Sequence, residues 1–355
     1  MIFKRYGYGH IVINASKFIF PITSFALKEN TKLVIGNVDF VDFVYLKNNL
    51  IKDKSNYIKQ FEELFKNINT YAIIDLSKFG DYKDLCEAGN NSLALQILKQ
   101  TIGALYISIY FNYKKLGEYD CERRIVISDS GVNIVDEGLS SYVSINNDRY
   151  TFNAYSISKS LFTSEADLDL DSIKPILEIM KKEINIRNQY ENKICKSLEI
   201  IYSIINENSS RERVFKWPII WNYLFREDNG DININFITKK LKAIFNIISP
   251  QKILEQIPNK LVNNLNDTSK ISKIVEDIYI KIRNKIMHGH IRLYEEYTVC
   301  TIENIIIYKV ITLELIHTLC QNEFLESCTS TNELNKFIST KEREYVKQKK
   351  KLNNH

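Results

Sequence analysis

The sequence predicts an α+β protein, in which an N-terminal mixed α/β domain is followed by an all-α helical domain. Between residues 1 and 164, short segments rich in Ile, Val and Phe alternate with turn residues and with helix-type periodicity. From residue 172 onward, apolar residues recur almost only at spacings of three and four. The length of 355 residues fits about two such domains.

Strands are expected mainly in the first half of the chain. Residues 10–20 and 32–43 are rich in β-branched and aromatic residues, and residues 71–76 form a short apolar run that is expected to be a buried strand. Turn residues between further strand-type segments predict two hairpins, which join 124–128 to 132–135 and 142–145 to 150–152.

Two helices are also expected in this half. Ser55 can cap the first, whose apolar face extends to residue 68. Asn91 or Ser92 can cap the second. The apolar residues of this second helix fall on one stripe and are Leu95, Leu98, Ile102, Leu105 and Ile109.

An acidic stretch at residues 163–172 marks the expected domain boundary. Asp171 or Ser172 can cap the helix that follows, and Pro175 lies where the first turn of a helix tolerates proline. Such acidic runs are commonly linkers or partners of a helix dipole.

The second half is expected to be almost entirely helical. One long helical stretch is predicted over residues 173–207, and Trp217 and Trp221, four residues apart, are expected to pack in a core. Further helices are expected at 215–225, 233–247, 271–288 and 301–324. Residues 331–355 form a basic tail with a frayed end from 341, which either binds RNA phosphates or only aids solubility.

The helix expected at residues 271–288 ends in an unusual polar cluster. Arg283, Asn284 and His288 crowd into its last turns, and Gly289 follows as a helix stop. The helix C-terminus favours a protonated imidazole, which can exchange protons near neutral pH. Arginine can bind a phosphate through two hydrogen bonds. The spacing places Arg283 and His288 roughly 140° apart, so they converge through the length of arginine or across a two-fold axis.

The residues Arg283-Asn284-Lys285-Ile286-Met287-His288-Gly289 resemble the R-x(4–6)-H motif of the HEPN superfamily, in the extended form of Apea-like HEPN domains. His290 also lies within the permitted spacing. A second match to the bare motif, Arg5 to His10, contains two glycines, which disfavour a helix there. The resemblance covers the C-terminal half and assigns residues 172–330 to a HEPN-like domain.

An arginine and a histidine suit phosphodiester transfer by the 2′-hydroxyl of RNA. This reaction needs a group that transfers protons and a positively charged side chain next to the phosphate. The resemblance implies a metal-independent endoribonuclease that acts as a homodimer and leaves 2′,3′-cyclic phosphate ends. Arg283 and His288 are the expected catalytic residues. Asn284, Lys285 and His290 are expected to contact substrate, and Asn284 can instead orient His288. For His290, a loop or cap role is favoured over a catalytic one. No cofactor and no metal are expected.

A different reading is a non-catalytic module that binds RNA or a nucleotide and regulates another activity. The family also suggests a toxin or phage-defence effector, with residues 1–164 as a sensor or substrate selector and with an antitoxin or sensor partner. The six cysteines are scattered, the N-terminus carries no signal sequence, and no apolar run reaches about 20 residues. These features predict a cytoplasmic protein with no membrane partner. His317, Cys320 and Cys328 have metal-like spacing, but packing is the expected role.

Overall fold

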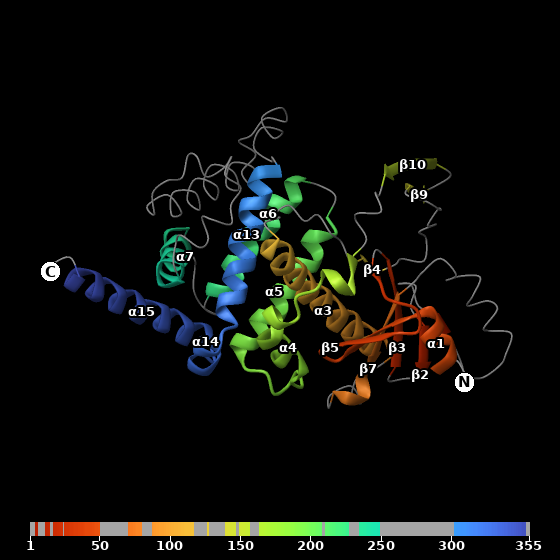
Figure 1. Cartoon of the computed structure of the whole chain (residues 1–355), viewed down its shortest axis with the longest axis horizontal. Coiled ribbons are helices and arrows are strands. Elements are labelled where there is room, and N and C mark those ends of the chain that lie inside the picture. The colour runs from red at the N-terminus through yellow and green to blue at the C-terminus, as the bar shows by residue number, and fades with distance from the viewer. Residues whose placement is uncertain are drawn as a thin grey trace. The chain divides into compact units, whose positions relative to one another are not determined.

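A computed structural model gives the structure of the chain (Figure 1). It describes residues 4–5, 11–14, 17–23, 25–49, 70–79, 87–116, 126–127, 139–146, 149–156, 163–207, 210–226, 234–248 and 302–352. The chain divides into two compact units, and the division between Leu168 and Asp169 falls inside the acidic stretch. The first unit comprises Met1–Ile109, Glu122–Leu168 and Glu183–Asn185, and the second comprises Tyr110–Cys121, Asp169–Lys182 and Ile186–His355.

The described residues confirm an α+β chain, with an antiparallel sheet near the N-terminus and mostly helices later. The main sheet of the described part contains seven strands, in the order β1-β2-β3-β7-β6-β5, and β8 pairs with β3. These strands are β1 (Lys4–Arg5), β2 (Ile11–Asn14), β3 (Lys17–Thr23), β5 (Lys32–Ile35), β6 (Val38–Asp42), β7 (Thr70–Asp75) and β8 (Val126–Ile127).

Each of the first two expected strands is in fact an antiparallel pair. Residues 10–20 contain β2 and the first part of β3, which pair from Ile11↔Ile19 to Asn14↔Lys17. Residues 32–43 contain β5 and β6, joined by a two-residue turn in which Gly36 has φ 58°. Glycine reaches this left-handed conformation without a steric penalty. Strands are therefore confirmed in both segments, but the reversals within them were not predicted, because strand propensity does not change where the chain reverses.

β7 confirms the buried strand expected at residues 71–76. It pairs with β3 on one side and with β6 on the other, and Tyr71 and Ile74 are fully buried. Phe25 and Phe40 pack edge to face in the core of this unit, with ring centroids 5.7 Å apart. β4 (Phe25–Ala26) pairs in parallel with β11 (Thr163–Ser164).

The second expected hairpin is confirmed by β9 (Leu139–Asn146) and β10 (Arg149–Ser156), which pair from Arg149↔Asn146 to Ser156↔Leu139. The first expected hairpin is only partly described. Its first segment contains β8, whose partner is β3, whereas residues 132–135 lie outside the described residues. The helix expected after Ser55 also lies outside them.

A short helix, α1 (Phe43–Asn49), follows β6 and is capped by Asp42, which accepts from Val44 N at 3.0 Å.

Helix α3 (Glu87–Lys115) begins earlier than the expected caps at Asn91 or Ser92. Leu98, Ile102 and Leu105 of the predicted stripe are fully buried. The part from Ser92 to Lys115 is long and apolar enough to cross a membrane, but 78% of its most apolar window is buried inside the protein. This helix is therefore a core helix of the fold.

The boundary segment is ordered into short turns rather than an extended linker. β11 is followed by the 3₁₀ turns η4 (Glu165–Asp167) and η5 (Asp171–Ile173). Helix α4 (Lys174–Lys181) then begins with Pro175 in its first turn, as expected. The cap position is Ile173, which makes no side-chain capping bond, so the capping roles predicted for Asp171 and Ser172 were wrong.

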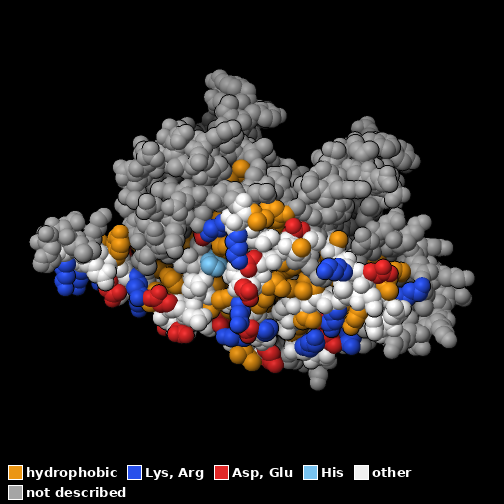
Figure 2. All heavy atoms as spheres, in the orientation of Figure 1, with side chains coloured by type: hydrophobic (Ala, Val, Ile, Leu, Met, Phe, Trp, Pro, Cys, Tyr) orange, Lys and Arg blue, Asp and Glu red, His pale blue; other side chains and the backbone are white. Residues whose placement is uncertain are grey.

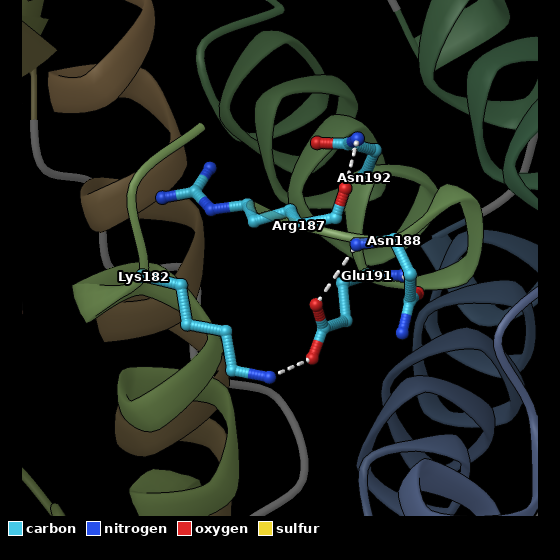
Figure 3. A network of polar contacts seen from close by, with 5 residues as sticks. All are labelled: Lys182, Arg187, Asn188, Glu191 and Asn192. Carbon is cyan, nitrogen blue, oxygen red and sulfur yellow. Dashed lines mark hydrogen bonds and ion pairs between the residues drawn. The ribbon is translucent and has the colours of Figure 1, made fainter. Parts of the chain in front are cut away.

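The long helix expected over residues 173–207 is broken into α4 and α5 (Gln189–Ile205). Asn188 and Glu191 form a capping box: Asn188 Oδ1 accepts from Glu191 N at 2.9 Å, and Glu191 Oε2 accepts from Asn188 N at 3.1 Å. Lys182 forms an ion pair with the same Glu191 carboxylate, so it connects the end of α4 to the start of α5 (Figure 3). Arg187, which is buried, donates to the Met180 carbonyl at 2.8 Å.

The remaining helices build the core of the second unit. They are α6 (Ser210–Phe225), α7 (Ile234–Ile248), α13 (Ile302–Leu319), α14 (Asn322–Ser327) and α15 (Thr331–Leu352). Helix α6 packs against α5 and α13, and α15 packs against α7 (Figure 1). Trp217 and Trp221 are buried, which confirms their expected core role. Trp221 Nε1 donates to Thr312 Oγ1 at 2.9 Å.

The basic tail is not frayed between residues 341 and 352. It forms the second half of α15, which continues unbroken to Leu352. Leu334 and Ile338 in the first half of the helix are fully buried, and they anchor it to the second unit. Packing stabilises this first half, and the following residues, rich in Glu, Lys and Gln, have the propensity to continue the helix.

Candidate functional site

The predicted catalytic pair and its neighbours belong to the segment between α7 and α13. Arg283, Asn284, Lys285, His288 and His290 lie within residues 249–301, outside the described residues. The expected helix at 271–288, the geometry of the motif and the choice between His288 and His290 therefore stay predictions.

Helices α7 and α13 flank residues 249–301 in the chain. α7 ends at Ile248 and α13 begins at Ile302, and both belong to the second, helical unit. Leu241 and Ile244 of α7 and Ile311 and Leu315 of α13 are buried, so both flanking helices contribute to a helical core. The other R-x(4)-H match begins at Arg5, which lies in strand β1, as its glycines indicated.

A cluster of titratable side chains surrounds Glu314 of α13 in the second unit. Glu314 Oε1 accepts from Tyr110 Oη at 2.9 Å and from Lys114 Nζ at 2.7 Å. One turn further, the ring of His317 packs against Phe111 in a tilted arrangement, with centroids 4.3 Å apart. The carboxylate is thus held by two donors from α3, which connect that part of α3 to α13.

Burial lowers the pKa of His317, although Glu314, a backbone hydrogen bond to Ser172 and Asp169 act in the opposite direction and Lys114 adds to the lowering. The unfolded chain therefore takes up a proton at a higher pH than the folded protein does. As the pH falls through the ordinary histidine pKa of about 6.5, protonation of His317 in the unfolded chain should decrease the free energy of unfolding. Above that pH the residue is neutral in both states, so its ionisation does not affect stability.

Urea unfolding of the wild type and of His317→Gln at about pH 7.5 and about pH 5.5 measures this contribution. The variant should lose less stability on acidification than the wild type. An identical pH dependence of the two proteins would contradict the expected shift.

The metal-like spacing of His317, Cys320 and Cys328 does not correspond to a metal site in the described residues. No group of three or more His, Cys, Asp or Glu side chains is arranged there to hold an ion. Cys320 and Cys328 are buried, and burial raises the pKa of both thiols, to about 11 for Cys328. A buried neutral thiol packs as a small apolar side chain, which matches the expected role.

A cationic pocket lies between α7 and α15, and the sequence interpretation did not identify it. Its volume is about 350 Å³, and its described lining includes Lys240, Asn332, Lys336, Ser339, Thr340 and Arg343. None of the described lining residues is acidic. A pocket with ammonium, guanidinium, amide and hydroxyl groups is suited to an anion with several acceptor oxygens.

The chain matches no protein-family model, no curated protein and no solved structure. The features that bear on function are therefore the motif at Arg283–Gly289 and the surfaces that the described helices present.

Proposed function

We propose that the protein is a metal-independent endoribonuclease of the HEPN type. The observation that carries the proposal is the sequence Arg283-Asn284-Lys285-Ile286-Met287-His288-Gly289. Its position supports the proposal, because the segment that contains it connects two buried helices, α7 and α13, of one helical unit. A catalytic helix needs such support if its end is to be held in one orientation.

In the proposed reaction, the 2′-hydroxyl of the RNA attacks the adjacent phosphorus, and the 5′-oxygen of the next nucleotide leaves. His288 transfers the protons, and Arg283 stabilises the charge on the phosphoryl oxygens. Asn284, Lys285 and His290 bind the strand. The products are a 2′,3′-cyclic phosphate and a 5′-hydroxyl.

The active form is proposed to be a homodimer in which two motifs share one cleft. A second copy supplies a second acid/base and resolves the angular separation of Arg283 and His288 on one helix. Sedimentation of the protein at assay concentration tests this. A strictly monomeric protein with full activity would contradict the shared cleft.

The setting proposed for this activity is the cytoplasm, where RNA is the substrate. The N-terminal unit would sense a signal or select the target, and an antitoxin or sensor partner would restrain cleavage. These roles are drawn from the likeness to HEPN effectors.

Purified protein should cleave single-stranded RNA in excess EDTA, because the reaction uses the substrate's own nucleophile and no metal ion. End analysis should find a 2′,3′-cyclic phosphate on the upstream fragment. Cleavage that requires an added divalent ion, or that leaves a 3′-hydroxyl, would exclude this mechanism.

The cationic pocket between α7 and α15 favours a second candidate, a regulatory module that binds RNA or a nucleotide without cleaving it. Anion binding by Lys240, Lys336 and Arg343 needs no proton transfer. This candidate predicts binding of RNA or nucleotide with no turnover under any condition. Detection of cyclic phosphate products decides between the two.

A further inference from the structure

We infer that the pocket between α7 and α15 binds a backbone phosphate of a single-stranded RNA, which then continues along the basic face of α15. The choice of RNA rests on the proposed function. The pocket itself is formed by described residues of the two helices.

The pocket contains a cation that is fixed in place. Lys240 of α7 is only 6% exposed, and its Nζ donates to Asn335 O at 2.6 Å and to Ser339 Oγ at 2.8 Å. Its ammonium also lies 5.2 Å from the ring centroid of Phe236. An ammonium held by two partners of α15 loses little further freedom when an anion binds, so it is preorganised for a phosphate.

Two more cations of α15 complete the pocket. Lys336 and Arg343 are exposed and both line the pocket, and Lys336 also interacts electrostatically with Glu333 on the same helix. They are seven residues apart, which is about two helical turns, so they project from one side of α15. Arginine can bind two phosphate oxygens at once, and the neighbouring Asn332 and Thr340 add neutral donors.

The basic face continues past the pocket towards the C-terminus. Lys336, Arg343, Lys347 and Lys350 fall within about 30° of a common direction on the helix, whereas Glu333 and Glu344 project about 70° or more from it. Lys347 and Lys350 are exposed. Lys and Arg side chains gather at the C-terminal end of α15, at the left of the space-filling view (Figure 2).

The length of this face indicates a strand rather than a single phosphate. From Lys336 to Lys350 the helix rises by about 21 Å, which is more than one phosphate group can span. Only a polyanion can contact all of these cations at the same time. Its binding releases counterions and therefore weakens as the salt concentration rises.

Binding is measured by fluorescence anisotropy with labelled 2′-O-methyl oligouridine of about 12 nucleotides, over a range of salt concentrations. This probe lacks the attacking hydroxyl, so the wild-type chain cannot cut it by the proposed mechanism. The test variant is Lys336→Ala/Arg343→Ala, whose side chains are exposed. The matched control, Lys28→Ala/Lys78→Ala, removes two exposed lysines from the first unit.

The test variant should bind about tenfold more weakly at low salt, and its salt slope should fall by about 1.4, since each phosphate contact contributes roughly 0.7 for a single strand. The control should bind like the wild type. Equal losses in both variants, or no loss in the test variant, would overturn the inference. So would uridine monophosphate that binds as tightly as the oligonucleotide.

The two proposals fail separately. Pocket-dependent binding of the probe by a protein that never cuts RNA would support the inference and overturn the nuclease. Cleavage that is unaffected by Lys336→Ala/Arg343→Ala, with unchanged binding, would overturn the inference and leave the nuclease intact.

Discussion

Replacing His288 by alanine is expected to lower the rate of RNA cleavage by about 10²–10⁴-fold, because the reaction loses its proton-transfer group. Arg283→Ala should cost roughly 10²–10³-fold, since the charge on the phosphoryl oxygens loses its strongest partner. Both rates are measured in EDTA with a defined single-stranded RNA, and circular dichroism checks that each variant is folded.

His290→Ala is the matched control for the histidine. It removes the same side chain two residues away, and it should change the rate by less than about tenfold if His290 only contacts substrate. A severe loss in His290→Ala together with an active His288→Ala would reverse the assignment of the two histidines. Full activity of both single variants would remove the motif from the catalytic site.

Trp221→Ala is expected to destabilise the second unit by about 3–5 kcal/mol, the range for truncating a buried aromatic side chain. Trp221 is fully buried, packs beside Tyr308 with ring centroids 5.5 Å apart, and donates to Thr312 Oγ1. Truncation leaves a large cavity where α6 packs against α13 and removes the donor that the Thr312 oxygen accepts from. Urea unfolding followed by circular dichroism measures the loss.

Ile219→Ala, on the same helix, provides the comparison. Ile219 is 43% exposed, so its truncation should change the free energy of unfolding by about 0.5 kcal/mol or less. Trp221→Phe should fall between the two, because it keeps most of the ring volume and loses the hydrogen bond. Equal effects of Trp221→Ala and Ile219→Ala would show that the α6–α13 contact does not limit stability.

The positions of buried residues could be predicted from the sequence more reliably than the ends of elements. Periodicity identified the apolar stripe of α3 and the buried tryptophans of α6, because burial imposes the 3.6-residue repeat directly. It did not show the break between α4 and α5, where apolar residues continue through the loop. The signal was nonetheless present, since Asn188 and Glu191 have the spacing of a capping box.

The two candidate sites also differ in how far the sequence could predict them. The Arg283/His288 site is a local pattern that a sequence can reveal, and its geometry lies outside the described residues. The pocket between α7 and α15 joins Lys240 to residues about 100 positions further along the chain. Such a site depends on how two helices pack, which no local pattern contains. The basic composition of residues 331–355 and the i, i+7 spacing of Lys336 and Arg343 were clues to one side of it only.

Helix α3 has a practical consequence for dissecting the molecule. Its residues up to Ile109 belong to the first unit, and those from Tyr110 onward belong to the second. A recombinant fragment that started at Asp169 would omit the turn that carries Tyr110 and Lys114, and it would strip Glu314 of both donors. If such a fragment were insoluble, or were no longer toxic, the cause would be a damaged core. The result would not show which half of the chain carries the activity.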